Sequence, residues 1–255
     1  MKTPFVIAVS LIAMLASLTN VSAAVSPPFQ SVQESPGASA LPRVTASELA
    51  RTAPGADPEV IAMGLAAMRC AQASGQGEDA TRLGIIDYSM SSRTPRLWVF
   101  DLPRRRLLFH ELVAHGSGSG GDVPTHFSNV NDTHASSIGL YLTQHTYQGA
   151  NGYSLRMAGL DKGFNDAAME RAIVMHGAPY VNKDIGKQLG RLGRSWGCPA
   201  LPKDKSRPII NVMKDGQFLF AYYPDKRWLT QSSLAQCAVA HLGNVNPAKS
   251  LASLR

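Results

Sequence analysis

Apolar residues at helical spacing predict two helices near the start of the folded part of the chain. Thr45 followed by Glu48 has the pattern of a capping box, so a short helix is expected there. A longer helix is expected after Asp57, because Asp is a favoured N-cap and Pro58 suits the first helical position. Its apolar side continues to about Ser74.

Further along the chain the apolar pattern changes to short segments rich in branched and aromatic residues, which is typical of strands. Pro103 and its basic neighbours predict a tight turn between two of them. The expected strands cover residues 83–88, 96–102, 106–113, 137–143, 153–160, 171–175 and 217–223. One more helix is expected at 208–214. Many strands with few helices predict a mainly β (α+β) fold, a sandwich or barrel flanked by helices on its N-terminal side.

Residues 1–23 have the pattern of a signal peptide. Met1-Lys2 supplies a basic start, an apolar run follows, and Ala23 ends a small-residue cleavage site. The apolar run is shorter than the roughly 20 residues of a membrane-spanning helix. We therefore expect export, with no stable membrane span once the signal is removed. An uncleaved membrane anchor is the competing interpretation of this segment.

The remaining chain divides into three parts by composition. Residues 24–44 are rich in Ser, Pro and Ala and predict a flexible tether. A single folded domain is expected at 45–241, followed by a C-terminal tail at 242–255. The domain is long enough for one sizeable hydrophobic core.

The chain is basic, with a formal net charge of +7 and a pI of about 9.5. An exported basic protein meets anionic wall polymers and lipid head groups, so we expect no nucleic-acid partner. The glycine-rich segment 116–121 lacks the Lys-Ser/Thr of a phosphate-binding loop, so no nucleotide is expected either. Charge therefore indicates the kind of surroundings without identifying a ligand.

Three cysteines are present, and an odd number in an oxidising compartment indicates one disulfide and one free thiol. Cys70 lies on the longer predicted helix, and Cys237 lies near the other end of the domain. A disulfide between them would leave Cys198 free. The count permits this pairing and leaves the others open.

Cys198 and His176 are the candidate pair for chemistry. An apolar strand is expected to deliver His176 at its end, directly before Gly177, while Cys198 follows Gly197 on a glycine-containing turn. A thiol is a weak nucleophile until a nearby imidazole or a positive field favours its thiolate. This pair predicts a nucleophile and its base.

The surroundings of Cys198 would complete such a site. The backbone N–H groups of Trp196, Gly197 and Cys198 are candidates for stabilising an oxyanion. Positive potential would come from the nearby basic residues Lys187, Arg191 and Arg194.

The chain contains a His-Gly pair, and the cysteine of a Ser-x-Gly-Cys string follows 22 positions after the histidine. This pattern resembles the active-site signature of the L,D-transpeptidase catalytic domain (YkuD-type). The most similar branch is the murein L,D-transpeptidase catalytic domain family, where strings like RSWGCPAL occur. The resemblance continues upstream through RLWVFDLPRRRLLFHELVAHGSGSG, FSNVNDTHASSIGLYLT and GYSLRMAGLDKGFNDAAMERAIVMHGAPYV. It covers roughly residues 60–235.

The resemblance implies an L,D-transpeptidase-type β-sandwich or barrel and an exported, periplasmic or wall-associated enzyme acting on peptidoglycan stem peptides. Cys198 would form an acyl-enzyme at the third residue of a donor stem, and His176 would be the general base. The carbonyl of Gly177 would orient the imidazole, and Ser195 and Gly197 would shape the turn. No metal or organic cofactor is implied.

Two departures from the family pattern affect the expected contacts. Trp196 stands where many relatives have His, so His176 would act without a second imidazole. Pro199-Ala200-Leu201 stand where polar residues often follow the cysteine, which makes Arg194 the candidate substrate contact in their place. His115, which leads into a glycine loop, is a candidate cleft residue or a surface histidine.

A zinc-protease motif is suggested by His110 and His115 and fails on spacing. The two histidines are five apart, whereas sharing a helix face requires four, so no metal site is expected there.

The resemblance leaves the exact reaction open. Cross-linking, exchange and L,D-carboxypeptidase activity are all compatible with a Cys198 acyl-enzyme, and the acceptor amine and the oligomeric state are undetermined. Two further functions compete with an L,D-transpeptidase: a different cysteine peptidase or amidase of wall peptides, and a peptidoglycan-binding module without catalysis.

Overall fold

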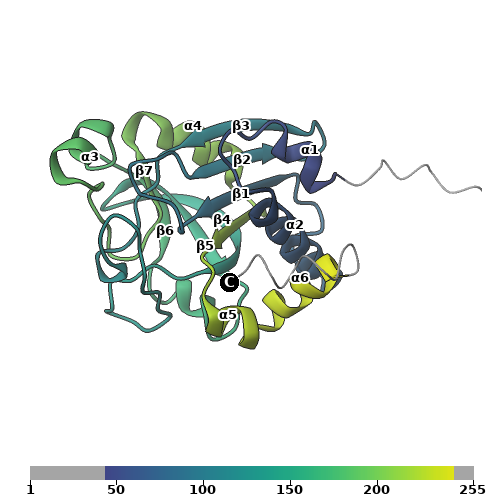
Figure 1. The fold of residues 1–255 in the computed structure, drawn as a ribbon. Coiled ribbons are helices and arrows are strands. Elements are labelled where there is room, and N and C mark those ends of the chain that lie inside the picture. Colours follow the sequence, from purple (N-terminus) through teal and green to yellow (C-terminus); the bar gives the residue numbers. More distant parts are fainter. Residues whose placement is uncertain (1–43, 244–255) are drawn as a thin grey trace, which may run out of the picture. The chain divides into compact units, whose positions relative to one another are not determined.

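The computed structural model describes residues 44–243 (Figure 1). The predicted signal peptide and nearly all of the predicted tether lie outside the described residues, as does the chain beyond Gly243. The last helix ends at Gly243, two residues past the end that we expected for the folded domain. Among the described residues, none of the helices has the length and apolar character needed to cross a bilayer.

Eight strands form one mixed sheet, in the order β3-β2-β1-β8-β4-β5-β6-β7. The mainly β prediction is confirmed. Neighbouring strands are antiparallel except for two parallel pairs, β1 with β8 and β6 with β7. The strands are β1 Arg82–Asp87, β2 Leu97–Asp101, β3 Arg106–Glu111, β4 Gly139–Gly149, β5 Gly152–Gly159, β6 Val174–Ala178, β7 Ala200–Pro202 and β8 Phe218–Tyr222.

Six α-helices surround this sheet in the described part of the chain (Figure 1). They are α1 Ala46–Ala50, α2 Pro58–Ala73, α3 Lys183–Leu189, α4 Lys203–Met213, α5 Lys226–Gln231 and α6 Ser233–Gly243. Short 3₁₀ turns occur at Ser117–Ser119 and Asp166–Ala168. The two predicted N-termini are confirmed: Thr45 and Glu48 form the capping box, and the Asp57 side chain accepts a hydrogen bond from Glu59 N–H.

The sequence pattern did not predict four elements of the described chain: α3, α5, α6 and β7. Strand β7 has three residues, too few for a periodicity to show. The predicted helix at 208–214 begins earlier, at Lys203, and runs through Pro208. Helix α4 tolerates this proline because Ile209, Ile210 and Met213 are fully buried, and packing contributes more to helix stability than local propensity does.

Helix α2 is the most deeply buried helix of the core, with ten buried residues among its sixteen. It lies against α6 and against the sheet (Figure 1). At Gly64 the helix comes so close to the sheet that a β-carbon would lie 3.1 Å from the Phe220 ring and 3.2 Å from Ile85. Glycine at this position therefore sets the distance between α2 and the sheet.

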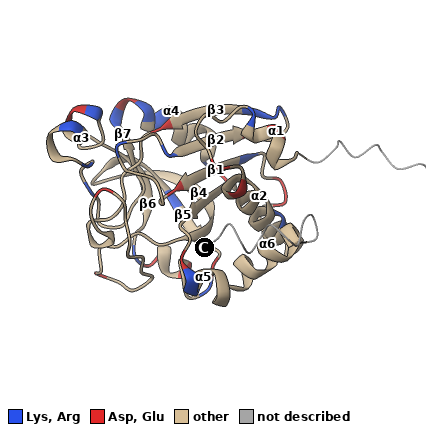
Figure 2. Cartoon of the chain, in the orientation of Figure 1, with Lys and Arg blue, Asp and Glu red and all other residues tan. Residues whose placement is uncertain are grey.

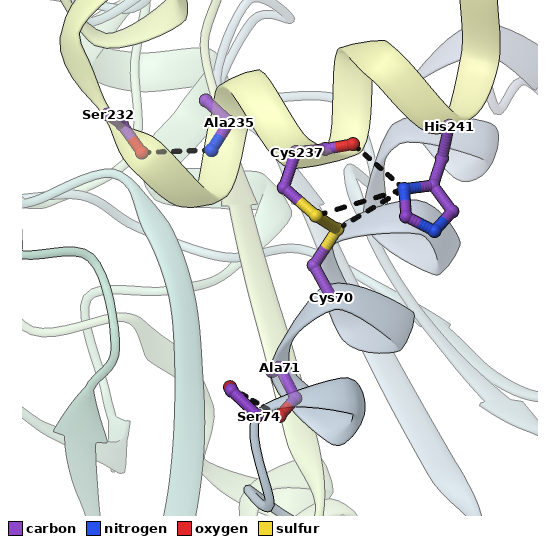
Figure 3. Close-up of a disulfide and its surroundings, with 7 residues drawn as sticks. All are labelled: Cys70, Ala71, Ser74, Ser232, Ala235, Cys237 and His241. Atoms are coloured by element: carbon purple, nitrogen blue, oxygen red, sulfur yellow. Dashed lines mark hydrogen bonds between the residues drawn. A yellow bond between two sulfur atoms is a disulfide. The ribbon is translucent and has the colours of Figure 1, made fainter. Parts of the chain in front are cut away.

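The disulfide between Cys70 and Cys237 joins α2 to α6, which confirms the predicted pairing (Figure 3). Helix α6 has two buried residues, Ala235 and Ala238, and no Lys, Arg, Asp or Glu side chain (Figure 2). Leu234, Val239 and Leu242 of α6 pack against the core as well, so apolar contacts and the covalent bond together hold α6 to the domain.

We expect the double variant Cys70→Ser/Cys237→Ser to lose roughly 2–4 kcal/mol of unfolding free energy, because the bond restricts the unfolded chain over a long loop. Denaturant unfolding of both proteins measures the loss. A phosphine reductant should lower the unfolding free energy of the wild type to that of the double variant. It should leave the unfolding free energy of the double variant unchanged. Equal sensitivity of both proteins to the reductant would contradict this expectation.

Candidate active site

The loop that carries Cys198 lies between β6 and the segment 113–117. On one side β7 pairs with β6 in parallel, with His176 opposite Ala200. On the other side Ala200 pairs with Ala114, Ser117 N–H donates to Ser195 O at 2.8 Å, and Ser195 N–H donates to His115 O at 3.0 Å. Backbone hydrogen bonds therefore hold the loop from both sides.

Ser195 closes the turn that presents the cysteine. Its hydroxyl donates to Cys198 O at 2.6 Å and accepts from Gly197 N–H at 3.2 Å. Gly197 has φ +110°, and a β-carbon there would lie 2.8 Å from Ala135 O, so a side chain is excluded on two grounds. The Gly197 N–H is thus already paired within the turn.

Ser136 ties this turn to the neighbouring segments, a contact that the sequence did not indicate. Its hydroxyl donates to Gly197 O at 2.9 Å and accepts from Gly116 N–H at 3.0 Å. A serine in a polar stretch between strands has the local pattern of a turn cap. Only the folded chain brings it to the cysteine loop.

His176 lies on β6 and is buried, with 2% of its surface exposed. Its Nδ1 lies 3.1 Å from Gly177 O, and since a carbonyl can only accept, Nδ1 carries the proton and Nε2 keeps its lone pair. Burial lowers the pKa of His176 below its usual value, although the Gly177 carbonyl opposes this. The imidazole is therefore neutral at pH 7 and able to accept a proton.

The sulfur of Cys198 contacts the backbone just before His176. Val174 N–H donates to Sγ at 3.4 Å, and Sγ–H donates to Ala172 O at 3.8 Å. Val174 and His176 are two residues apart on one strand, so their side chains share a face. In the described chain the sulfur bonds to these backbone groups rather than to the imidazole, which lies further along the strand. Catalytic hydrogen bonds often tighten only when substrate is bound.

Burial raises the pKa of the Cys198 thiol, and three nearby groups oppose that effect: Val174 N–H, the Arg171 guanidinium and the cysteine's own N–H. Arg171 is the cation that acts on the thiol. Its guanidinium also donates to Ser137 Oγ at 2.6 Å and Ala135 O at 2.7 Å, which fixes its position.

The sequence pattern places Arg171 at the start of a strand and does not indicate its role beside the thiol. Strand β6 begins at Val174, and Arg171 lies in the turn before it. The sequence signal that could have pointed to Arg171 is its place as a basic residue five positions before the candidate histidine. Its meaning depends on the fold, because Arg171 is distant from Cys198 in sequence.

The basic residues expected near the thiol lie elsewhere or have other partners. Lys187 is exposed on α3. Arg191 donates to Leu192 O at 2.9 Å, and Arg194 donates to Gly120 O at 2.6 Å and to Ser117 O at 3.3 Å. Arg194 thus braces the glycine loop beside the cysteine loop. The charged helices α3 and α4 are visible at the edge of the domain in Figure 2.

His115 lies inside the domain, with 1% of its surface exposed. Its Nδ1 accepts from Arg96 Nη2 at 2.8 Å, and Arg96 is itself fully buried. Burial, together with the Arg96 charge, lowers the pKa of His115 to about 4. The buried ring supports the segment whose backbone holds Ser195, so it is neither a surface histidine nor an open cleft residue.

Trp196 points outward, with 75% of its surface exposed. Its ring stacks on His134, with ring centroids 4.8 Å apart and an angle of 5° between the planes. The position two before the cysteine therefore presents an exposed aromatic face, and the imidazole beside it comes from another loop.

A free cysteine on a rigid turn, beside a strand that carries a neutral histidine, supplies the two residue types that cysteine-dependent acyl transfer uses. The sequence profile of the L,D-transpeptidase catalytic domain matches residues 52–222, which is more than half of the chain. The chain therefore belongs to the L,D-transpeptidase catalytic domain family. A comparison with curated proteins finds no match.

A comparison with solved structures matches several L,D-transpeptidases at low identity. One from Mycobacterium smegmatis is 14% identical, with a TM-score of 0.35 over 56% of this chain and 59% of that one. One from Mycobacterium tuberculosis H37Rv is 16% identical, with a TM-score of 0.33 over 56% and 58%. The helical cell shape determining protein Pgp2 of Campylobacter jejuni is 11% identical, with a TM-score of 0.39 over 65% and 55%. This chain thus spans less than two thirds of each of them.

We expect alkylation of Cys198 by iodoacetamide to keep accelerating above about pH 8.5, the usual thiol pKa. The thiolate is the reacting form, and a raised pKa leaves less of it at neutral pH. Arg171→Met should slow alkylation further at any given pH, whereas Arg171→Lys should retain most of the rate. Mass spectrometry of the adduct over time measures this, with the unfolded protein as control. A rate plateau below pH 8 would contradict the expectation.

Proposed function

We propose that this protein is an exported L,D-transpeptidase that acts on peptidoglycan stem peptides through an acyl-enzyme at Cys198. The observation that carries the proposal is that the Cys198 sulfur contacts the same strand that holds His176. The sulfur contacts the N–H of Val174 on the strand that holds His176, and the Arg171 charge lowers the thiol pKa against the effect of burial. Family membership identifies the class of reaction that such a setting would serve.

Nucleophile activation begins with two neutral partners. His176 Nε2 accepts the proton of the Cys198 thiol, while Nδ1–H stays hydrogen-bonded to Gly177 O. The Arg171 guanidinium then faces a thiolate instead of a thiol, so its Coulomb attraction favours the charged form. This step requires the cysteine side chain to turn from Ala172 O toward the imidazole.

The sulfur attacks the carbonyl carbon of the third stem residue, at the bond between an L-centre and a D-centre. The carbonyl oxygen gains negative charge, for which the N–H groups of Trp196 and Cys198 are the proposed donors, because Gly197 N–H is bonded to Ser195 Oγ. The imidazolium of His176 then protonates the departing nitrogen of the D-residue. A thioester at Cys198 remains.

The fate of the thioester decides the overall reaction. Attack by an amine gives a cross-link or an exchanged D-residue, and attack by water gives L,D-carboxypeptidase activity. The exposed Trp196 ring beside the nucleophile is the proposed contact for the non-reacting part of the substrate, where aromatic surface adds binding energy. In this proposal Arg194 does not contact the substrate directly and acts through the glycine loop that it braces.

Export is supported by the signal-peptide pattern of residues 1–23 and by the disulfide. Disulfides persist in oxidising compartments such as the periplasm and are rare in the cytosol. The proposed location is therefore the periplasm or the cell wall, where stem peptides are found.

Incubation with a carbapenem should add one acyl group to the wild-type protein, seen as a mass increase. Cys198→Ala should abolish the adduct, because it removes the nucleophile. His176→Gln should slow acylation by roughly 10²-fold or more, the usual contribution of a general base. Cys70→Ala is the matched cysteine control and should still acylate. Wild-type protein that gives no adduct after reduction would refute the acyl-enzyme.

Muropeptide digests separate the possible reactions. We expect release of the terminal D-residue from a tetrapeptide stem, with transfer to an amine when one is supplied, and chromatography with mass spectrometry identifies the products. Cleavage at the amide between sugar and peptide would instead indicate an amidase. Binding to sacculi without any product, in a protein that also fails to acylate, would indicate a wall-binding module.

A further inference from the structure

A second cluster of reactive side chains lies at the junction of α2 and α6, away from β6 and β7 (Figures 1 and 3). It consists of Cys70, Cys237 and His241, whose potential ligand atoms all lie within 4.8 Å of one another. The His241 Nδ1 is 3.6 Å from Cys70 Sγ and 3.8 Å from Cys237 Sγ. Figure 3 shows the imidazole directed at both sulfurs.

These distances fit a tetrahedral zinc ion. With Zn–S bonds of about 2.3 Å and Zn–N bonds of about 2.0–2.1 Å, a tetrahedral ion places sulfur and nitrogen about 3.6 Å apart. The imidazole already stands close to this separation from both sulfurs. When the disulfide is reduced, the sulfurs need to separate to about 3.8 Å, which rotation of the two side chains provides.

The elements that carry the three residues also suit a metal site. Cys237 and His241 are four residues apart on α6, so they share one face of the helix, and Cys70 comes from α2 opposite. Cys70 is buried, Cys237 is half-buried and His241 is exposed. An ion can therefore enter from the His241 side and reach two ligands held by packed helices.

We propose that the reduced protein binds one zinc-type divalent cation through Cys70, Cys237 and His241, with water in the fourth position. Thiolate and imidazole ligands favour zinc over magnesium or calcium. The ion would clamp α6 to α2 in the reduced chain, as the disulfide does in the oxidised chain. The inference does not depend on the reaction at Cys198.

Reduction of the disulfide frees both sulfurs for the metal. A dithiol reductant attacks the disulfide, the S–S bond breaks, and the protein gains two thiols while the reductant becomes a disulfide. The cation then displaces the two thiol protons to solvent. His241 Nδ1–H donates to Cys237 O at 2.9 Å in the oxidised chain, so its proton moves to Nε2 and frees the Nδ1 lone pair for the metal.

Cobalt(II) titration of the full chain tests the proposal, because thiolate-bound Co²⁺ has charge-transfer and visible bands of tetrahedral type. The chain carries Cys198→Ala, so that Cys70 and Cys237 are its thiols, and a phosphine keeps them reduced. We expect one equivalent to bind and zinc to displace it. Cys237→Ser should abolish the bands, and His241→Ala should weaken binding at least tenfold. His145→Ala, at an exposed histidine on β4, is the matched control.

Thermal unfolding gives the second measurement. Zinc should raise the unfolding midpoint of the reduced protein and leave that of the oxidised protein unchanged, since a ligand stabilises the form that binds it. Absence of the charge-transfer band would overturn the proposal, as would equal affinity of the His241→Ala and His145→Ala proteins. Binding without any rise in the midpoint would also overturn it, because it would place the metal on unfolded chain.

Discussion

The parallel pairing of β7 with β6 is the constraint on which the rest of the site depends. It is three residues long, yet it fixes the chain after Cys198 against the strand of His176. In sequence, the segment 177–197, which includes the helix α3, separates the two residues. The same short strand also pairs with Ala114 on its other side, so the cysteine loop cannot move without breaking bonds to both neighbours.

Burial around this pairing affects the charge state of both candidate groups, Cys198 and His176. It lowers the pKa of His176 and raises that of the Cys198 thiol, so the resting pair is neutral. A neutral pair costs little to bury, whereas a separated ion pair in the same place would carry a desolvation penalty. Arg171 and the backbone N–H groups supply the opposing field close to the sulfur.

The elements that stabilise the fold and the candidate active site lie at different parts of the sheet. Helix α2 and the disulfide to α6 cover the region around β1 and β8, whereas the cysteine loop is at the β6–β7 edge. The loop is held by backbone hydrogen bonds and by serine side chains, in particular Ser136 and Ser195. Such contacts fix an atom's position more narrowly than apolar packing does, because a hydrogen bond is directional.

The fold class, most strands, the starts of α1 and α2 and the disulfide could all be predicted from the amino-acid sequence, and the sequence also indicates Cys198 and His176 as the candidate pair. These features follow from patterns that can be read directly in the sequence: periodicity, capping residues, the number of cysteines and the His-Gly and Ser-Trp-Gly-Cys strings. The folded chain was needed to show that Arg171 is the cation acting on the thiol. It was also needed to place His115 against buried Arg96 and to turn Trp196 outward. Electrostatic and hydrogen-bond partners depend on distance in space, and residues far apart in sequence meet only once the sheet has formed.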